Sequence, residues 1–387
     1  MACPNNCHTL FTHSTKSSFL ENLRLNSREE SLLKETRDEI RKVIVKGFEQ
    51  QREALLSSHT KYELPTPRFY TQGSFAYRTI IDPAYPPEQQ ADLDFGIYLP
   101  FEKLLADRKP KETARTYFAL IESILQAYGK WDLKIKNTCI RVILRGWRAH
   151  IDLPLYGIPA SDFNQVVEAK ATLKFNQRTE DKSTLDKLDP TCVHLAKSDG
   201  SWQPSDPRVI RDWIDSSCAN YGVSNQIRSI CKYLKAWRDE KWSDGGGPSS
   251  ILLLAVTIHN YRHSSGQHHE LLKNIIDVLP NSLSRPVLVP APIPGDEYHQ
   301  EDLRERLDET LKQEFKDAFA ELKSKYDIAM TTNNAHIANN TLIDIFGNRM
   351  PFDPDRIVNN TTPPSHKVTN TSASVAPLAM GTESAGG

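Results

Sequence analysis

The chain has 387 residues, 39% of them hydrophobic, which is enough apolar material for a sizeable core divided between two lobes. Its formal net charge of -1 argues against a globally basic nucleic-acid-binding protein, and no apolar run reaches the roughly 18 residues of a membrane span. No signal-peptide pattern opens the sequence and the six cysteines are scattered, so we expect a cytoplasmic protein with reduced thiols.

The first half of the sequence predicts a mixed α+β lobe. Ser27-Arg28-Glu29-Glu30 is a capping box, and the apolar spacing after it predicts a long helix that can act as a spine across two lobes. Further along we expect a Gly73-Ser74 turn, a strand around residues 92–99, a helix over 111–128, and two β-rich runs, 139–146 and 148–158.

The second half is predicted to be mainly helical. Helices are expected after the cap Ser205-Asp206, over 224–242, in the very apolar stretch 249–263, and as a charged amphipathic helix over 299–330. The last residues have few large apolar side chains and should be disordered. The predicted organisation is an N-terminal extension (1–26), a spine helix with the catalytic lobe (27–200), a helical nucleotide-binding lobe (201–358) and a disordered tail (359–387).

Asp92 and Asp94 stand one residue apart in an apolar run. Residues i and i+2 of a strand point to the same face, so both carboxylates should point together while Leu93 and Phe95 pack into the core behind them. Two carboxylates at that separation repel each other unless a cation lies between them. Mg²⁺ is the natural candidate, because it combines one or two carboxylates with substrate phosphates.

Asp152 supplies a third acid from a later strand, with Ile151 and Leu153 on the opposite face. Three acids on strands can hold two metal ions, one activating a hydroxyl nucleophile and one steadying a leaving pyrophosphate. The Gly73-Ser74 turn offers backbone N–H groups and a hydroxyl to a phosphate. Together these residues outline a phosphoryl-transfer site.

The order of these features resembles the nucleotidyltransferase superfamily: a G-S turn, a D-x-D strand, a helix and a distal Asp. More specifically, six segments resemble, in order, the bacterial cGAS/DncV-like nucleotidyltransferases (CD-NTases) of CBASS anti-phage defence, nearest the branch that makes cyclic GMP-AMP. The resemblance covers roughly residues 60–350 and implies a polymerase-beta-like mixed sheet with a helical C-terminal lobe. The segments are QGSFAYRT, DLDFGIYLP, HIDLPLYGIP, SDPRVIRDW, YLKAWRDEKW with GGPSSI, and FGNRMP.

The resemblance also implies roles for individual residues. Asp92, Asp94 and Asp152 would ligate Mg²⁺, with two ions expected, and Asp152 would help to deprotonate the attacking 3′-hydroxyl. The implied nucleotide contacts are Gln72, Gly73 and Ser74 around the donor triphosphate, Tyr77 stacked on a purine, Lys235 and Ser249 on the donor phosphates, Ser205 and Asp206 at the donor base, and Arg141 at the acceptor nucleotide.

Plainer interpretations stay open for several of these residues. Tyr77 could be a half-buried hairpin residue, Lys235 a solvated lysine beside the apolar stripe of its helix, and Ser205 with Asp206 a helix cap without any other function. Gly387 is implied to be a conjugation site for a ubiquitin-transfer-like enzyme, and the alternative is a frayed terminus.

The function that the sequence favours is a Mg²⁺-dependent enzyme that joins nucleoside triphosphates, ATP and GTP among them, into a cyclic di- or oligonucleotide without a nucleic-acid template. One alternative is a template-free polymerase that extends RNA or makes linear oligoadenylate. Another is a nucleotide-binding regulator with a dead site. A phosphoryl transfer of this kind requires positioning and charge neutralisation rather than a covalent nucleophile, which suits a site of acids, Ser and Lys.

Overall fold

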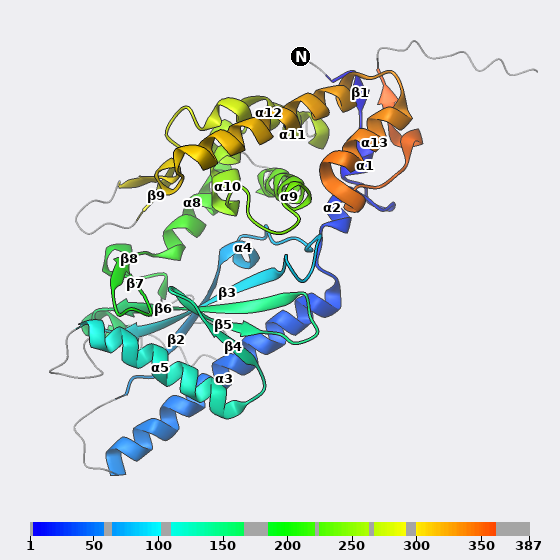
Figure 1. Ribbon diagram of the computed structural model, residues 1–387. Helices are drawn as coiled ribbons and strands as arrows, with labels where there is room; N and C mark the ends of the chain where they lie inside the picture. Colours follow the sequence, from blue (N-terminus) through cyan, green and yellow to red (C-terminus); the bar gives the residue numbers. More distant parts are fainter. Residues whose placement is uncertain are drawn as a thin grey trace, which may run out of the picture.

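The computed structural model describes residues 3–57, 64–101, 110–165, 185–220, 224–262, 267–291 and 299–360. Figure 1 shows two lobes, one built on a β-sheet and the other on helices. The expected α+β fold with a helical second lobe is confirmed. Within the ranges above, none of the helices has the length and apolar character needed to cross a lipid bilayer.

A mixed seven-stranded sheet forms the first lobe. The strands β3 and β6 are parallel to each other, and every other pairing in the sheet is antiparallel. The pairing places β3 and β6 side by side at the centre. The strand order is β2 (Arg68–Gln72), β3 (Ala91–Pro100), β6 (Ala149–Ile158), β5 (Cys139–Ile143) and β4 (Asp132–Ile135), while β7 (His194–Ala196) pairs with β6 and with β8 (Trp202–Pro204).

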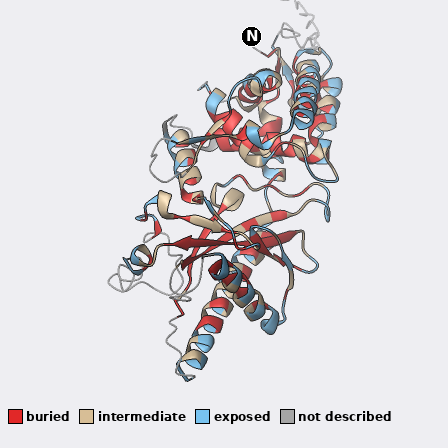
Figure 2. Ribbon diagram, turned by 60° about the vertical axis from the view of Figure 1, so that its left-hand side comes forward, coloured by how far each residue is buried: buried red, intermediate tan, exposed pale blue. Residues whose placement is uncertain are grey.

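Two helices, α3 (Ser27–Ser57) and α5 (Pro110–Tyr128), share one apolar core with the sheet (Figure 1). Figure 2 shows that the buried residues of α3 line its inner side and the exposed ones its outer side. The predicted spine helix is therefore present, but its cap lies one residue earlier than expected. Asn26 Oδ1 accepts a hydrogen bond from Glu29 N at 2.8 Å, and its amide donates to the Glu29 carboxylate at 2.7 Å.

The second lobe is helical, as expected, and α10 (Ser250–Asn260) is its buried centre, with every residue from Leu252 to Ile258 buried. The helix predicted over 299–330 starts only at Glu309, because Asp308 caps it by accepting from Leu311 N at 2.8 Å. The other elements are α8 (Pro207–Asn220), α9 (Ser224–Lys241), α11 (His268–Ser282), β9 (Leu288–Pro290), β10 (Gln300–Asp302), the 3-10 turn η2 (Leu303–Arg306), α12 (Glu309–Thr331), α13 (Ala335–Phe346), and the turns η3 (Gly347–Arg349) and η4 (Pro354–Arg356).

The N-terminal segment belongs to the core of the helical lobe. Leu10, Phe11 and Phe19 are fully buried, and the ring of Phe19 stacks on Tyr233 of α9 at 5.1 Å. In Figure 1 this segment lies beside α13. Its elements are β1 (Asn5–Asn6), which pairs with β11 (Val358–Asn359), and the short helices α1 (His8–Phe11) and α2 (Phe19–Asn22).

Two of the domain boundaries proposed from the sequence fall slightly away from the ends of the structural elements. β11 places Asn359, expected in the tail, in a strand pair with Asn5, whereas residues from 361 onward lie outside the described ranges. β8 continues the sheet to Pro204, slightly beyond the proposed boundary at residue 200.

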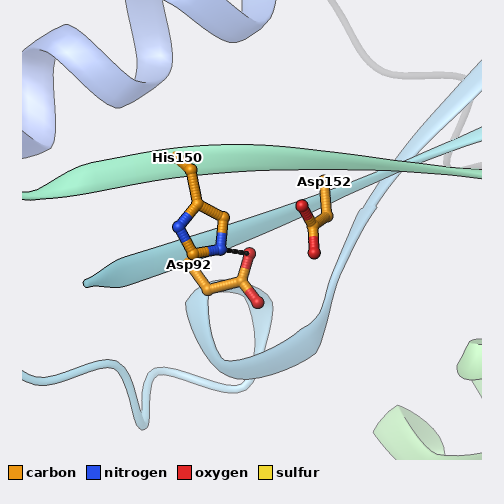
Figure 3. A group of neighbouring side chains, drawn as sticks. All are labelled: Asp92, His150 and Asp152. Carbon is orange, nitrogen blue, oxygen red and sulfur yellow. Dashed lines mark ion pairs between the residues drawn. The ribbon is translucent and has the colours of Figure 1, made fainter. Parts of the chain in front are cut away.

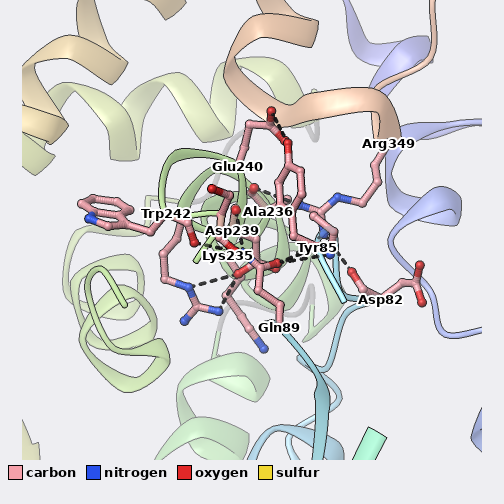
Figure 4. A network of polar contacts seen from close by, with 12 residues as sticks. Asp82, Tyr85, Gln89, Lys235, Ala236, Asp239, Glu240, Trp242 and Arg349 are labelled. Atoms are coloured by element: carbon pink, nitrogen blue, oxygen red, sulfur yellow. Dashed lines mark hydrogen bonds and ion pairs between the residues drawn. The ribbon is translucent and has the colours of Figure 1, made fainter. Parts of the chain in front are cut away.

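The loop over residues 82–90 bonds the two lobes together directly before β3 begins (Figure 4). The side-chain amide of Gln89 donates to the carbonyl oxygens of Asp239 and Trp242, at 2.7 and 3.0 Å, at the end of α9 and just after it. Because β3 carries the two acids of the D-x-D pair, this loop fixes their strand to the helical lobe.

Arg349 joins the same loop to α9, and its loss should destabilise the fold. It donates to the carbonyl oxygens of Asp82 at 2.8 Å and Ala236 at 3.0 Å. We expect Arg349→Ala to lower the free energy of unfolding in urea by about 2–4 kcal/mol, because both carbonyls lose a charged donor. Arg145→Ala, which removes an exposed ion pair with Asp132, should leave the unfolding curve unchanged. Equal curves for both variants would contradict a role for Arg349 between the lobes.

Candidate active site

The acids predicted from the sequence meet on one face of the central strand pair. In the parallel register of β3 and β6, Asp94 lies opposite Asp152 and Asp92 lies opposite His150. The alternate residues Leu93 and Phe95 are buried in the core on the other face, as the period of two predicts. The result is a square of three carboxylates and one imidazole.

Arg141 of β5 holds Asp152 in place. Its Nε and Nη2 donate to Asp152 Oδ1 and Oδ2 at 2.6 and 2.7 Å, and Lys136 Nζ lies 3.8 Å from Oδ2. Burial would raise the pKa of Asp152, but the hydrogen bonds and the positive charge of Arg141 outweigh it, and the pKa lies below its usual value. Asp152 therefore presents an ionised carboxylate. The structure places Arg141, predicted at an acceptor nucleotide, on this acid.

The surroundings of Asp94 shift its pKa in the opposite direction from that of Asp152. Burial raises the pKa of Asp94 to about 8, and the negative charges of Asp92 and Asp152 contribute in the same direction. Gly73 begins the short helix α4 (Gly73–Ala76) with a φ of +68°, and a Cβ built on it would lie 1.8 Å from Asp94 Oδ2. Only glycine allows the predicted Gly-Ser turn to approach this carboxylate so closely.

This raised pKa predicts a pH dependence of stability. An unfolded Asp loses its proton near pH 4, whereas folded Asp94 keeps its proton up to about pH 8. Stability should therefore fall as the pH rises across that interval. We expect the Tm of Asp94→Asn, measured with EDTA, to exceed that of the unmodified chain by more at pH 8 than at pH 5. A difference that does not change with pH would show that Asp94 ionises freely.

Asp92, His150 and Asp152 form a group that could hold a metal ion (Figure 3). One ligand atom from each lies within 4.8 Å of the others, and His150 Nε2 lies 3.1 Å from Asp92 Oδ1. The sequence analysis missed His150. The signal was available, because His150 and Asp152 are separated by one residue on a strand, just as Asp92 and Asp94 are.

A cleft of about 520 Å³ is lined by residues of both lobes and includes Asp92 and Asp94 of β3, but not Asp152 or His150 of β6. Six of the predicted site residues line it, namely Gly73, Ser74, Tyr77, Asp92, Asp94 and Lys235. On the helical side its lining also includes Arg238, Trp242 and Ser250, which the sequence analysis did not single out.

Lys235 of α9 enters this cleft as a buried cation. Only 5% of the residue is exposed, and its Nζ donates to Thr79 O at 2.8 Å. Burial, helped by the positive charge of Arg238, lowers the pKa of Lys235 to about 8. Lys235 is thus not a solvated lysine. Arg238, one turn further along α9, donates to Ser250 Oγ at 2.9 Å.

Two predicted nucleotide-binding residues have structural partners beside the cleft. The Gln72 amide donates to Tyr156 Oη at 2.8 Å behind the Gly-Ser turn. Tyr77 lines the cleft, and its hydroxyl donates to Pro207 O at 3.4 Å.

The remaining predicted residues lie at helix starts and do not line the cleft. Ser249 caps α10, accepting from Leu252 N at 3.3 Å, while its neighbour Ser250 reaches the cleft. Asp206 is 2% exposed and forms an ion pair with Arg208, and Ser205 N donates to Val193 O at 3.1 Å. Their predicted contacts with the donor nucleotide stay predictions.

This arrangement can hold a divalent cation at the acids and a polyanion between the Gly-Ser turn and Lys235. A mixed sheet with a D-x-D strand, a third Asp on the adjacent parallel strand and a helical lobe across the cleft defines a nucleotidyltransferase of the polymerase-beta-like class. Two family descriptions match the chain. "Cyclic GMP-AMP synthase DncV-like, nucleotidyltransferase domain" matches residues 67–156, and "Cyclic GMP-AMP synthase, C-terminal domain" matches residues 224–359. The chain belongs to the DncV-like nucleotidyltransferase family.

Curated relatives and solved structures agree with this assignment. The chain is 34% identical over 247 residues to a cyclic GMP-AMP synthase of Vibrio cholerae, which covers 58% of this chain and 55% of that protein. A cyclic GMP-AMP synthase of Escherichia coli is 31% identical over 237 residues, 57% of this chain and 54% of that protein. The chain thus spans about half the length of the curated relatives it matches.

The structural match extends further. Vibrio cholerae DncV in complex with the linear intermediate 5′ pppA(3′,5′)pG superposes with a TM-score of 0.75 and 26% identity, over 92% of this chain and 99% of that one. A DncV mutant in complex with ATP, GTP and 5MTHFGLU2 superposes with a TM-score of 0.76 and 26% identity, with the same coverage.

Proposed function

We propose that this chain is a divalent-metal-dependent nucleotidyltransferase that joins nucleoside triphosphates, with ATP and GTP as substrates, into a cyclic di- or oligonucleotide. The observation that carries the proposal is the square of acids on β3 and β6, whose members Asp92 and Asp94 line a cleft that also contains the buried Lys235 of the helical lobe. The relatives named above make the same product class. A second-messenger role in anti-phage signalling follows from the family and forms part of the proposal.

The residues of the site fit the metal that such chemistry requires, with Mg²⁺ and two ions proposed. Asp92, Asp94 and Asp152 would hold it, and bound ions would supply charge neutralisation at the attacking hydroxyl and the leaving pyrophosphate. Arg141 keeps Asp152 ionised and oriented, so that this carboxylate can accept the proton of the 3′-hydroxyl. Lys235 and the backbone N–H groups after Gly73 would position the triphosphate for in-line attack.

One incubation tests the reaction class. The full chain is mixed with the four labelled nucleoside triphosphates and Mg²⁺, and the products are treated with phosphatase. A cyclic product survives phosphatase, a linear product of a template-free polymerase loses its terminal phosphates, and a regulator with a dead site makes nothing. Only the first outcome supports the proposal.

Gly73 provides a sharp test of the site because of its contact with Asp94. Gly73→Ala should lower the rate of synthesis by at least about a hundredfold, since the new Cβ displaces the Asp94 carboxylate. Gly146→Ala is the matched control: its φ is +76°, but nothing lies within 4 Å of a Cβ there. The control shares the backbone strain and should keep its activity. Equal losses in both variants would assign the effect to strain alone.

Gly387, the predicted conjugation site, lies outside the described residues. We propose that a ubiquitin-transfer-like enzyme joins this terminus to a target amine and thereby raises synthesis. Co-expression with such an enzyme should give higher-mass species that are lost in Gly387→Glu, and unmodified bands in both cases would end this part of the proposal.

A further inference from the structure

His150 is buried at the metal-binding face in a definite tautomer. Only 5% of the residue is exposed, and its Nδ1 lies 2.9 Å from the side-chain oxygen of Gln90. An amide oxygen can only accept a hydrogen bond, so Nδ1 carries the proton. In the neutral ring Nε2 is then left with a free lone pair.

This lone pair faces a carboxylate without a hydrogen bond between them. His150 Nε2 lies 3.1 Å from Asp92 Oδ1, yet both atoms are buried and neither makes a hydrogen bond within the described residues. The two atoms form an ion pair only if the ring is protonated; with a neutral ring, a cation bound between them would contact both the nitrogen and the carboxylate. Asp152 lies beside them: one ligand atom from each of Asp92, His150 and Asp152 lies within 4.8 Å of the other two (Figure 3).

We propose that His150 Nε2 is a metal ligand, so that the ion at Asp92 and Asp152 is bound by one nitrogen and two carboxylates. Gln90 acts as the partner that fixes the ring, in the manner of a carbonyl behind a metal-bound histidine. Imidazole suits transition metals, whereas Mg²⁺ prefers oxygen ligands. The site therefore selects Mn²⁺ over Mg²⁺ more strongly than three carboxylates would.

The other charged groups at this face are compatible with the assignment. Arg141 and Lys136 both contact Asp152, and among the described residues no Lys or Arg forms an ion pair with Asp92. The inference rests on the metal-dependent reaction proposed above. The test measures metal binding in the absence of nucleotide, so the His150 proposal can fail or succeed independently of the proposed function.

The experiment is pulsed EPR of the full chain loaded with Mn²⁺ alone. We expect electron spin echo modulation from one directly bound ¹⁴N, replaced by ¹⁵N modulation when the chain carries ¹⁵N-histidine. This measurement uses the unmodified chain, so it does not depend on whether a variant folds. Modulation from water protons only, at full Mn²⁺ occupancy, would overturn the proposal.

Variants then identify the residue. His150→Gln should abolish the nitrogen modulation and weaken Mn²⁺ binding on the order of tenfold, with a change in Mg²⁺ affinity of less than about threefold. Gln90→Leu should weaken Mn²⁺ binding in the same sense, because the ring loses its orienting acceptor. His336→Gln, on the exposed surface of α13, is the control and should bind both metals unchanged. Nitrogen modulation that persists in His150→Gln would refute His150 as the metal ligand, even if the chain makes cyclic product. If the unmodified chain shows nitrogen modulation but makes no cyclic product, only the proposed function is refuted.

Discussion

Replacing both Asp92 and Asp94 by Asn is expected to abolish synthesis from nucleoside triphosphates while the chain stays folded. The two side chains share one face of β3 opposite His150 and Asp152, and Asn keeps their shape but removes both carboxyl groups that could bind a cation. The variant then lacks two of the carboxylates that would attract a divalent ion, so a bound metal would no longer neutralise the charge of the leaving pyrophosphate.

The folded state of the double variant should gain stability, because burial and the negative charges of Asp92 and Asp152 oppose a charge on Asp94. Product formation is measured with labelled nucleotides after phosphatase treatment, and folding by the far-UV CD spectrum and Tm. Asp132→Asn is the control, since Asp132 lies on β4 of the same sheet in an exposed pair with Arg145. Synthesis by the double variant at a rate near that of the control would exclude the proposed mechanism.

Much of the acid site could be predicted because it follows from local rules. The period of two along β3 and β6 places Asp92, Asp94 and Asp152 on one face and apolar residues on the other. His150 obeys the same rule and could have been found with it. Its register opposite Asp92, however, depends on the parallel pairing of two strands about 50 residues apart, which no local pattern specifies.

The contacts between the lobes could not be predicted, because their partners are far apart in sequence. The segment FGNRMP was recognisable, but only the fold explains it. A Cβ on Gly347 would lie 2.1 Å from Glu240 Oε2, and the following turn carries Arg349 to Asp82 and Ala236. Tertiary context likewise decides the N-terminal segment, whose apolar residues are too few to form a core without the helical lobe.

Lys235→Met is expected to stabilise the nucleotide-free chain and to weaken nucleotide binding. Among the described residues no carboxylate lies within the 4.0 Å of an ion pair with Lys235, and its Nζ has only the carbonyl of Thr79 as a hydrogen-bond partner. A buried ammonium group without a counter-ion costs stability, which is why its pKa falls to about 8. A bound triphosphate would supply the missing negative charge.

The sign of the pH effect follows from the lowered pKa. Below about pH 8 Lys235 is charged in the folded and the unfolded chain, and the full cost is present. As the pH rises toward the unfolded value near 10.4, the folded chain releases its proton first and the cost disappears. The gain in Tm for Lys235→Met should therefore be largest near pH 7 and smallest near pH 10.

Whereas Lys235→Met should stabilise the nucleotide-free chain, it should weaken the binding of ATP and GTP. Loss of one charge-assisted hydrogen bond, worth about 1.5–3 kcal/mol, should raise the Kd for ATP and GTP about ten- to hundredfold. The nucleotides should then raise the Tm of the unmodified chain but hardly that of the variant. Lys241→Met is the matched control on the same helix, because Lys241 Nζ lies 2.6 Å from Glu321 and does not line the cleft. A Lys235 variant that is less stable than this control, yet binds ATP as the unmodified chain does, would show that Lys235 holds the fold together rather than the triphosphate.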